Sequence, residues 1–178
     1  VNEFRDYARL PAAELKPVDL NALVADVLNL YANDNAPAHV VTEIDPDCPN
    51  VMGDVQQLRQ VLHNLLQNAQ DATVSAGHAD VANAVVVKTQ WLASAQRVRL
   101  SVLDKGTGFP DHILKRAFEP YVTTKDKGTG LGLAVVKKIA DEHGTRVDIS
   151  NRMVDGQLTG AQVSLSFAIE RGAASPPG

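Results

Sequence analysis

The segment from Asp54 to Val74 carries apolar residues at alternating spacings of three and four along its whole length. This periodicity predicts one long amphipathic helix with a broad apolar face. The residues on that face are Leu58, Val61, Leu62, Leu65, Leu66, Ala69 and Ala72. A face of this width belongs in the core of a domain, with the rest of the chain packed over it.

The composition fits one ordinary globular domain. The chain has 178 residues, of which 44% are hydrophobic, and this is enough to bury a core of normal size. Its net charge of −4 contains no basic block, which argues against a general electrostatic grip on nucleic acid or on an anionic membrane. Cys48 is the single cysteine, so neither an internal disulfide nor a multi-cysteine zinc site is indicated. We therefore expect a cytoplasmic domain that finds its partners through specific sites.

The chain has no apolar run of the roughly 18 residues that a membrane-spanning helix needs, and its first residues lack a signal-peptide pattern. Because it begins at Val1, we expect a piece of a longer protein. An anchor in the inner membrane is compatible with that longer protein.

Shorter patterns surround the long helix. Helices are expected over residues 20–31, N-capped at Asp19 or Asn21, and over residues 130–142, with Gly144 as the C-cap. Strands are expected over residues 40–44, 84–92, 97–103, 146–150 and 161–169, with an antiparallel hairpin at 84–103. We expect residues 1–10 to end a helix, 11–17 to form a linker, 18–170 to form one domain, and 171–178 to be a disordered tail.

Four polar residues border the apolar face of the long helix: Gln57, Asn64, Asn68 and Asp71. Both asparagines therefore lie at the rim between core and solvent, where the wall of a pocket belongs. An asparagine carbonyl oxygen can ligate Mg²⁺, a hard cation that usually keeps several waters and is shared with substrate phosphates. The alternative is that the asparagines only hydrogen-bond a neighbouring loop.

Two glycine-rich segments lie at the ends of a loop of about 25 residues, which is long for a compact domain unless it serves in binding. Asp104-Lys-Gly106-Thr-Gly108 directly follows an apolar strand, so its carboxylate can accept a hydrogen bond from an exocyclic amine. Gly128-Thr-Gly-Leu-Gly-Leu133 leads into a helix start, where backbone N–H groups suit a phosphate. Alone, the first segment could equally be a turn and the second a hinge.

The order of these motifs resembles that of sensor histidine kinases. Asn64-Leu-Leu-Gln-Asn68-Ala resembles their N box, and Asp104-x-Gly106-x-Gly108 resembles their G1 box. Phe118-Glu-Pro-Tyr121 resembles their F box, and Gly128-x-Gly-Leu-Gly-Leu133 resembles their G2 box. The resemblance covers residues 17–169, the whole catalytic ATP-binding domain of the Bergerat (GHKL) fold.

The resemblance implies an α+β fold: a two-layer sandwich with a mixed, mostly antiparallel sheet, covered on one face by about three helices, and a long ATP lid. It implies that Asn68 ligates Mg²⁺, that Asp104 reads the adenine amine, and that Gly128 to Gly132 cradle the phosphates. Thr123, Thr124 and Lys125 would belong to the lid, and Lys125 would reach the phosphates unless it is simply a solvated lysine. The full set implied for the nucleotide is Asn64, Asn68, Asp71, Asp104, Gly106, Gly108, Thr124, Lys125, Gly128, Thr129, Gly130, Leu131, Gly132 and Leu133.

A closer resemblance is to the nitrogen-regulation branch of these kinases, the NtrB and NtrY types. It rests on Phe118-Glu-Pro-Tyr-Val-Thr-Thr-Lys125, on Ala69-Gln-Asp-Ala72, and on residues 1–11, which are similar to the end of the dimerisation helix in NtrY. Three positions depart from the family pattern. Asp71 replaces a basic residue, Lys105 replaces an asparagine, and Gly144-Thr145 replaces a pair of glycines. Because Asp71 is acidic, phosphate charge would have to be balanced by Mg²⁺ and lid lysines.

None of the five histidines has the sequence context of a phospho-acceptor, so all are interpreted as structural or solvated; a cationic His143 would suit the end of its helix. The family resemblance therefore implies that the γ-phosphate goes to a histidine on a dimerisation domain outside this chain, and from there to a response regulator. We expect this piece to be mainly monomeric and the full-length protein to be a homodimer. The alternatives are a GHKL ATPase of the gyrase or mismatch-repair type, an anti-sigma-type serine kinase, and a nucleotide-sensing module that transfers nothing. Asn64 argues against hydrolysis, because the ATPases carry a water-activating glutamate at that position.

Overall fold

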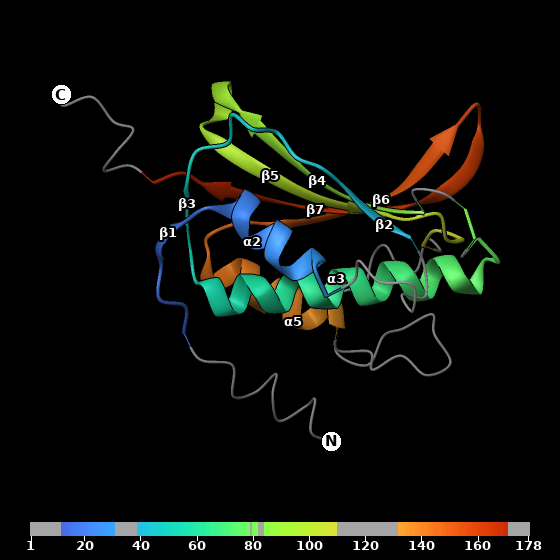
Figure 1. The fold of residues 1–178 in the computed structure, drawn as a ribbon, viewed down its shortest axis with the longest axis horizontal. Helices are drawn as coiled ribbons and strands as arrows, with labels where there is room; N and C mark the ends of the chain where they lie inside the picture. The colour runs from blue at the N-terminus through green and yellow to red at the C-terminus, as the bar shows by residue number, and fades with distance from the viewer. Residues whose placement is uncertain (1–11, 31–38, 79, 82–83, 110–131, 171–178) are drawn as a thin grey trace, which may run out of the picture.

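The computed structural model describes residues 12–30, 39–78, 80–81, 84–109 and 132–170 (Figure 1). Five strands form the main sheet: β2 (Val40–Glu43), β4 (Val85–Leu92), β5 (Arg97–Leu103), β6 (Val147–Val154) and β7 (Gln157–Ala168). Their order in the sheet is β2-β4-β5-β7-β6, with β2 parallel to β4 and the other pairs antiparallel. This confirms the expected mixed, mostly antiparallel sheet.

Three helices cover one face of this sheet: α2 (Leu20–Leu28), α3 (Val55–Ser75) and α5 (Gly132–Glu142) (Figure 1). The apolar face predicted for α3 is buried except at Ala72, which is half-buried, and Val61, Leu62 and Leu66 have no exposed surface. These side chains form one core with the inner face of the sheet, including Val87 and Phe167. The two-layer α+β architecture is therefore confirmed. The predicted lid lies outside the described residues.

The helix ends follow the local sequence. Asp19 caps α2 by accepting a hydrogen bond from the N–H of Ala22, and so it is Asp19 that caps the helix and Asn21 that does not. After α5, Gly144 has a φ of +65°, and the N–H of Thr145 donates to the carbonyl of Ala140. That bond is part of the C-cap that glycine allows, as predicted for Gly144.

The last two strands are longer than expected and form one hairpin. Their two-residue turn, Asp155-Gly156, has a positive φ at both residues, as a type I′ turn requires. These strands were expected only over residues 146–150 and 161–169, although the Asp-Gly pair between them is a signal for a hairpin turn. The hairpin extends past the rest of the sheet at the right of Figure 1.

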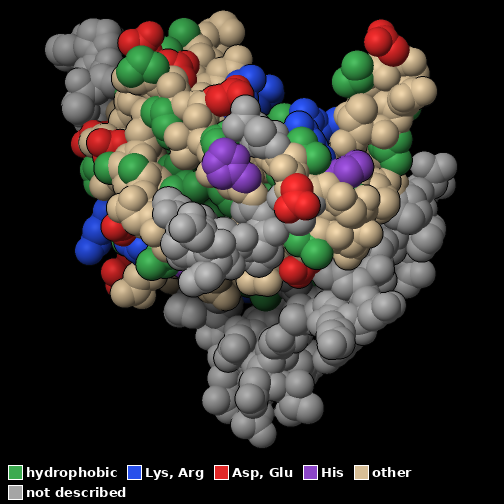
Figure 2. Space-filling view, turned by 45° about the vertical axis from the view of Figure 1, so that its right-hand side comes forward, with side chains coloured by type: hydrophobic (Ala, Val, Ile, Leu, Met, Phe, Trp, Pro, Cys, Tyr) green, Lys and Arg blue, Asp and Glu red, His purple; other side chains and the backbone are tan. Residues whose placement is uncertain are grey.

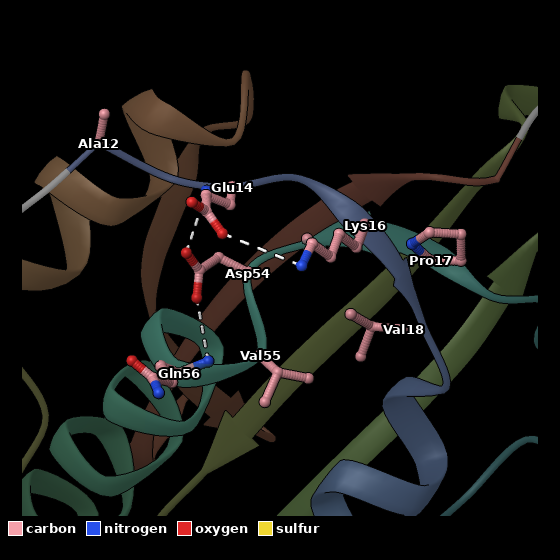
Figure 3. A pocket seen from close by; sticks show the side chains of 9 residues that line it. Ala12, Glu14, Lys16, Pro17, Val18, Asp54, Val55 and Gln56 are labelled. Carbon is pink, nitrogen blue, oxygen red and sulfur yellow. Dashed lines mark hydrogen bonds and ion pairs between the residues drawn. The ribbon is translucent and has the colours of Figure 1, made fainter.

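Two short strands lie outside the expected set. β1 (Lys16–Val18) pairs antiparallel with β3 (Val51–Gly53), and a bridge from Val51 to Ile169 connects β3 to the end of β7. The end of the predicted linker, residues 11–17, is therefore paired with a strand of the domain. A cleft of about 490 Å³ separates β1 from the start of α3 (Figure 3). It lies at the opposite end of α3 from the predicted nucleotide residues.

Asp54 ties this segment to α3. Its Oδ2 accepts a hydrogen bond from the N–H of Glu14 at 3.0 Å, and its Oδ1 accepts from the N–H of Gln56 (Figure 3). The same Oδ1 also accepts from the N–H of Gln57. This one carboxylate therefore caps α3 and binds the backbone of the segment that precedes β1.

In the described part of the chain, none of the helices combines the length and the apolar character that spanning a bilayer requires.

Candidate nucleotide-binding site

Three of the predicted site residues lie between the middle and the C-terminal end of α3. Asn64, Asn68 and Asp71 are all half-buried, between the core face of the helix and the solvent, as their spacing predicts. Asp71 accepts a long hydrogen bond of 3.5 Å from the Gln67 side chain, one turn earlier. The donor set of this rim, two amides and a carboxylate, consists of hard oxygen ligands and therefore fits Mg²⁺.

Asp104 lies at the end of β5 and is buried, with 7% of its surface exposed. Its Oδ1 accepts hydrogen bonds from the N–H of Gly106 at 2.8 Å and from the N–H of Ala161, in β7, at 3.1 Å. Among the described residues, its Oδ2 accepts no hydrogen bond. A buried carboxylate with one oxygen in use and one available suits a ligand that brings its own N–H donor.

The pKa of Asp104 is raised above the ordinary value of an aspartate. Desolvation is the largest cause, because burial disfavours the charged form. The hydrogen bonds from the N–H groups of Gly106 and Ala161, and the positive charge of Arg152, act in the opposite direction without cancelling it. The charged form of such a buried carboxyl group is stabilised by a ligand amine that donates a hydrogen bond to it, as an adenine amine would.

The loop from Asp104 to Phe109, here called the G1 loop, packs on the end of α3. The side of Gly106 faces Ala72 so closely that an added Cβ would lie 2.7 Å from the Ala72 Cβ and 3.0 Å from its backbone. The N–H of Lys105 donates to the Thr73 hydroxyl at 3.3 Å, and Nδ1 of His78 lies 2.6 Å from the Lys105 carbonyl oxygen. The loop is therefore fixed to the helical turn that follows Asn68.

The β6–β7 hairpin holds the same loop from the other side. Nη1 of Arg152 donates to the Asp104 carbonyl oxygen at 2.8 Å. Asn151 makes two bonds to Phe109: its Oδ1 accepts from the N–H at 2.6 Å, and its Nδ2 donates to the carbonyl oxygen at 2.8 Å. Figure 2 brings this end of the molecule forward and shows the hairpin standing clear of the body, with acidic and hydrophobic side chains at its tip.

Sequence reasoning missed Asn151, Arg152 and Gly160. The backbone of Gly160 runs so close to Asp104 that an added Cβ would lie 1.9 Å from the Asp104 carbonyl oxygen. Gly160 pairs with Arg152 in the β6–β7 register. Recognising the Asp155-Gly156 turn would have placed Thr159 opposite Arg152, because only the register shift after Arg152 brings Gly160 to that position. Nothing in the turn signal would have brought Arg152 or Gly160 to Asp104.

The remaining predicted residues belong to the second glycine segment and the loop before it. Gly132 is the first residue of α5, and Leu133 is half-buried against the core. Thr124, Lys125, Gly128, Thr129, Gly130 and Leu131 lie outside the described residues. α5 packs against α3, so the start of α5 belongs to the same helical layer as the asparagine rim.

Comparison with known proteins agrees with this geometry. Residues 53–171 match the family described as histidine kinase-, DNA gyrase B-, and HSP90-like ATPase. The chain is 35% identical over 172 residues to a putative sensor histidine kinase, NtrY-like, of Rickettsia bellii, covering 96% of this chain and 26% of that protein. It is 32% identical over 176 residues to the nitrogen regulation protein NtrY of Azorhizobium caulinodans, covering 99% of this chain and 22% of that protein.

Two solved structures are similar to the whole fold. Full-length ShkA in complex with AMPPNP has a TM-score of 0.76 and 28% identity, covering 95% of this chain and 35% of that one. Histidine kinase ThkA in complex with the response regulator protein TrrA has a TM-score of 0.71 and 26% identity, covering 93% of this chain and 45% of that one.

The chain therefore belongs to the family of histidine kinase-, DNA gyrase B- and HSP90-like ATPases. Within it, the chain corresponds to the catalytic ATP-binding domain of sensor histidine kinases, with relatives of the nitrogen-regulation type, which confirms the family resemblance. It spans about a quarter of the length of the curated relatives it matches, 26% and 22%.

Proposed function

We propose that this domain binds Mg²⁺-ATP and donates the γ-phosphate to a histidine on a dimerisation domain outside this chain. The observation that carries the proposal is the contact between the G1 loop and α3. Gly106 lies on Ala72, one helical turn beyond Asn68, so the loop that carries the buried Asp104 lies beside the part of α3 that carries the asparagines. A base-reading group and a set of oxygen ligands for a phosphate-bound cation thus occur together.

Adenine recognition is assigned to Asp104. The exocyclic amine of adenine is a hydrogen-bond donor, whereas guanine presents a carbonyl oxygen at the corresponding position. A carboxylate accepts from the amine and repels the carbonyl, so this site should prefer ATP to GTP. The glycines at 106 and 108 let the G1 loop that carries Asp104 pack closely on Ala72 and Asn151, where an added Cβ would lie 2.7 Å and 2.8 Å from the nearest atom.

Phosphate binding is assigned to the N-terminus of α5 and the glycine segment before it, with Asn68 as the protein ligand of Mg²⁺. A bound Mg²⁺ would neutralise phosphate charge, which here matters more because Asp71 adds a negative charge to the rim. The start of α5 offers backbone N–H groups and the positive end of the helix dipole to the phosphates.

Transfer needs a partner domain, because positioning and electrostatics dominate phosphoryl transfer and the acceptor lies elsewhere. The test is to mix the chain with Mg²⁺-ATP, with and without a separate histidine-bearing dimerisation domain from an NtrY-type kinase. We expect phosphohistidine only in the mixture. Phosphorylation of the chain alone, or none in the mixture, would contradict the proposal.

ATP hydrolysis is the second candidate, and Asn64 is the residue that separates the two. In the ATPases of this fold a glutamate at this position activates water, and an amide cannot act as a general base. We therefore expect very slow hydrolysis by the wild-type chain and a measurable increase in Asn64→Glu but not in Asn64→Gln. Rapid hydrolysis by the wild-type chain would favour the ATPase, and ATP binding without any transfer would favour a nucleotide-sensing module.

The wider assignments follow from the same proposal. Residues 1–10 would end the dimerisation helix, 11–17 would form the linker, and 171–178 would form a tail. The domain would act in the cytoplasm, whether or not the longer protein is anchored in the inner membrane. ThkA, a structural neighbour, was solved with a response regulator, which supports a receiver domain as the next partner here. This piece is expected to be monomeric and the whole protein a homodimer.

A further inference from the structure

The G1 loop is held at both ends by two neighbouring residues of one strand. Arg152 bonds the carbonyl of Asp104, where the loop begins, and Asn151 bonds both backbone groups of Phe109, where its described part ends. Both side chains are half-buried, so these bonds are partly shielded from water.

The approach of Asp104 to the hairpin requires a glycine. Arg152 and Gly160 are partners in the β6–β7 ladder, and the register shifts directly after Arg152. Because Gly160 has no side chain, the Asp104 carbonyl can lie against β7 while the guanidinium of Arg152 bonds it. The next residue, Ala161, bonds the carboxylate through its N–H at 3.1 Å. The hairpin thus contacts both the backbone and the side chain of Asp104.

We propose that Asn151 and Arg152 are positioning residues for adenine recognition, because they fix the two ends of the G1 loop relative to the sheet. This inference rests on the proposed role of Asp104. A loop fixed before binding loses less conformational entropy when it closes on a base, and a small displacement of a recognition group costs much of its selectivity. The pair determines specificity through Asp104 and Gly106, without touching the nucleotide itself.

The test measures affinity for ATP and GTP by calorimetry in Asn151→Ala and Arg152→Ala. Each variant loses one hydrogen-bonding side chain, so we expect about tenfold weaker ATP binding. GTP binding, which gains nothing from Asp104, should change little. The ratio of the two affinities should therefore fall towards one in both variants. Arg152→Lys keeps a cationic donor and should recover part of the ratio.

The chain offers matched controls. Arg97 is also half-buried, and its Nη2 donates to the Ser166 carbonyl at 2.6 Å, at the other end of β5. Asn21 is half-buried and bonds the Asp45 carbonyl and the Thr89 hydroxyl, away from the loop. Arg97→Ala and Asn21→Ala should lower the melting temperature by a similar amount while keeping the wild-type preference for ATP.

Three outcomes separate the inference from the function on which it rests. If Asn151→Ala and Arg152→Ala are folded and keep the wild-type ratio, while Asp104→Ala loses it, the inference is wrong and the role of Asp104 stands. If Asp104→Ala also keeps the ratio, the proposed adenine site itself is wrong. If an alanine variant does not fold, Arg152→Lys and Arg97→Lys are compared instead, because both keep the charge and most of the side chain. The ratio of ATP affinity to GTP affinity should then fall in Arg152→Lys only, and an unchanged ratio in Arg152→Lys would contradict the inference.

Discussion

Nε2 of His143, directly after α5, accepts a hydrogen bond of 3.0 Å from the backbone N–H of Asp54, the cap of α3. Nδ1 of the same ring lies 2.8 Å from the Ile139 carbonyl oxygen, so both ring nitrogens have backbone partners. The ring also meets Phe167 edge-on at 6.0 Å. His143 therefore connects two helices to the core of the sheet, which is the structural role expected of it.

Removing this ring should strongly destabilise the domain. His143 is 6% exposed, and His143→Ala would leave the Asp54 N–H without its partner and a cavity beside Phe167. We expect a loss of about 2–4 kcal/mol in the free energy of unfolding, measured by urea denaturation. Arg146→Ala is the control: its side chain is 89% exposed, and its ion pair with Asp148 should contribute less than about 1 kcal/mol. Equal effects of the two substitutions would contradict this account.

The Asp54 carboxylate should stabilise the fold in a pH-dependent way. Desolvation, the largest single influence, would raise its pKa. Hydrogen bonds from the N–H groups of Glu14, Gln57 and Gln56, with a smaller electrostatic effect of His143, together hold the pKa below its ordinary value. A folded-state pKa below the unfolded one stabilises the protein above the unfolded pKa, and this contribution is lost as the pH falls through the folded pKa. Asp54→Ala should cost about 1–2 kcal/mol at neutral pH. The difference in melting temperature from wild type should shrink in acid; a difference independent of pH would show that the charge has no part in the cap.

The Asp104 carboxylate should destabilise the ligand-free fold at neutral pH, in contrast to the Asp54 carboxylate. Its pKa is raised in the folded state, mainly by desolvation, so the folded protein loses stability as the pH rises from below the unfolded pKa through the folded one. Asp104→Asn keeps an oxygen for the Gly106 and Ala161 N–H groups without the buried charge. We expect the ligand-free variant to melt higher than wild type at neutral pH, with a smaller gain in acid, and to lose its preference for ATP. A lower melting temperature at neutral pH would contradict this prediction.

Gly160→Ala should disturb the base-reading loop more than the local strand. The new methyl group would lie 1.9 Å from the Asp104 carbonyl oxygen, so either the loop or the hairpin must move. We expect a loss of about 2 kcal/mol or more in stability, together with weaker ATP binding. Gly77→Ala is the control, because Gly77 has a φ of +79° but open space around it. That change should cost only about 1 kcal/mol and leave ATP affinity unchanged.

Local patterns were sufficient to predict the helical layer and much of the sheet. The apolar spacing of α3 is continuous over 21 residues, and the cap at Asp19 is a local bond to a residue three positions away. The strands β1 and β3 were missed because three residues are too short to show alternation, and their pairing joins segments far apart in the chain. The β6–β7 hairpin is a different case, because its Asp155-Gly156 signal was present and was overlooked.

The candidate site was predicted only in part for a similar reason. Asn64, Asn68 and Asp104 stand in motifs whose residue types indicate their chemistry. Arg152 has no such context: it reaches Asp104 across 48 positions of sequence, through a gap that exists only because β7 carries a glycine there. Contacts of this kind depend on strand order and register, which single residues do not encode.

The length of α3 has a mechanical consequence. Its 21 residues extend roughly 30 Å. One end is capped by Asp54, which also bonds the N–H of Glu14, and the other end packs against the G1 loop. Because a close-packed helix has low compressibility, a displacement at one end is transmitted to the other end with little internal deformation. We therefore expect a displacement of the segment that precedes β1 to move the whole domain and its bound nucleotide as a rigid body. Such a movement would change the position of the γ-phosphate more than the affinity for the nucleotide.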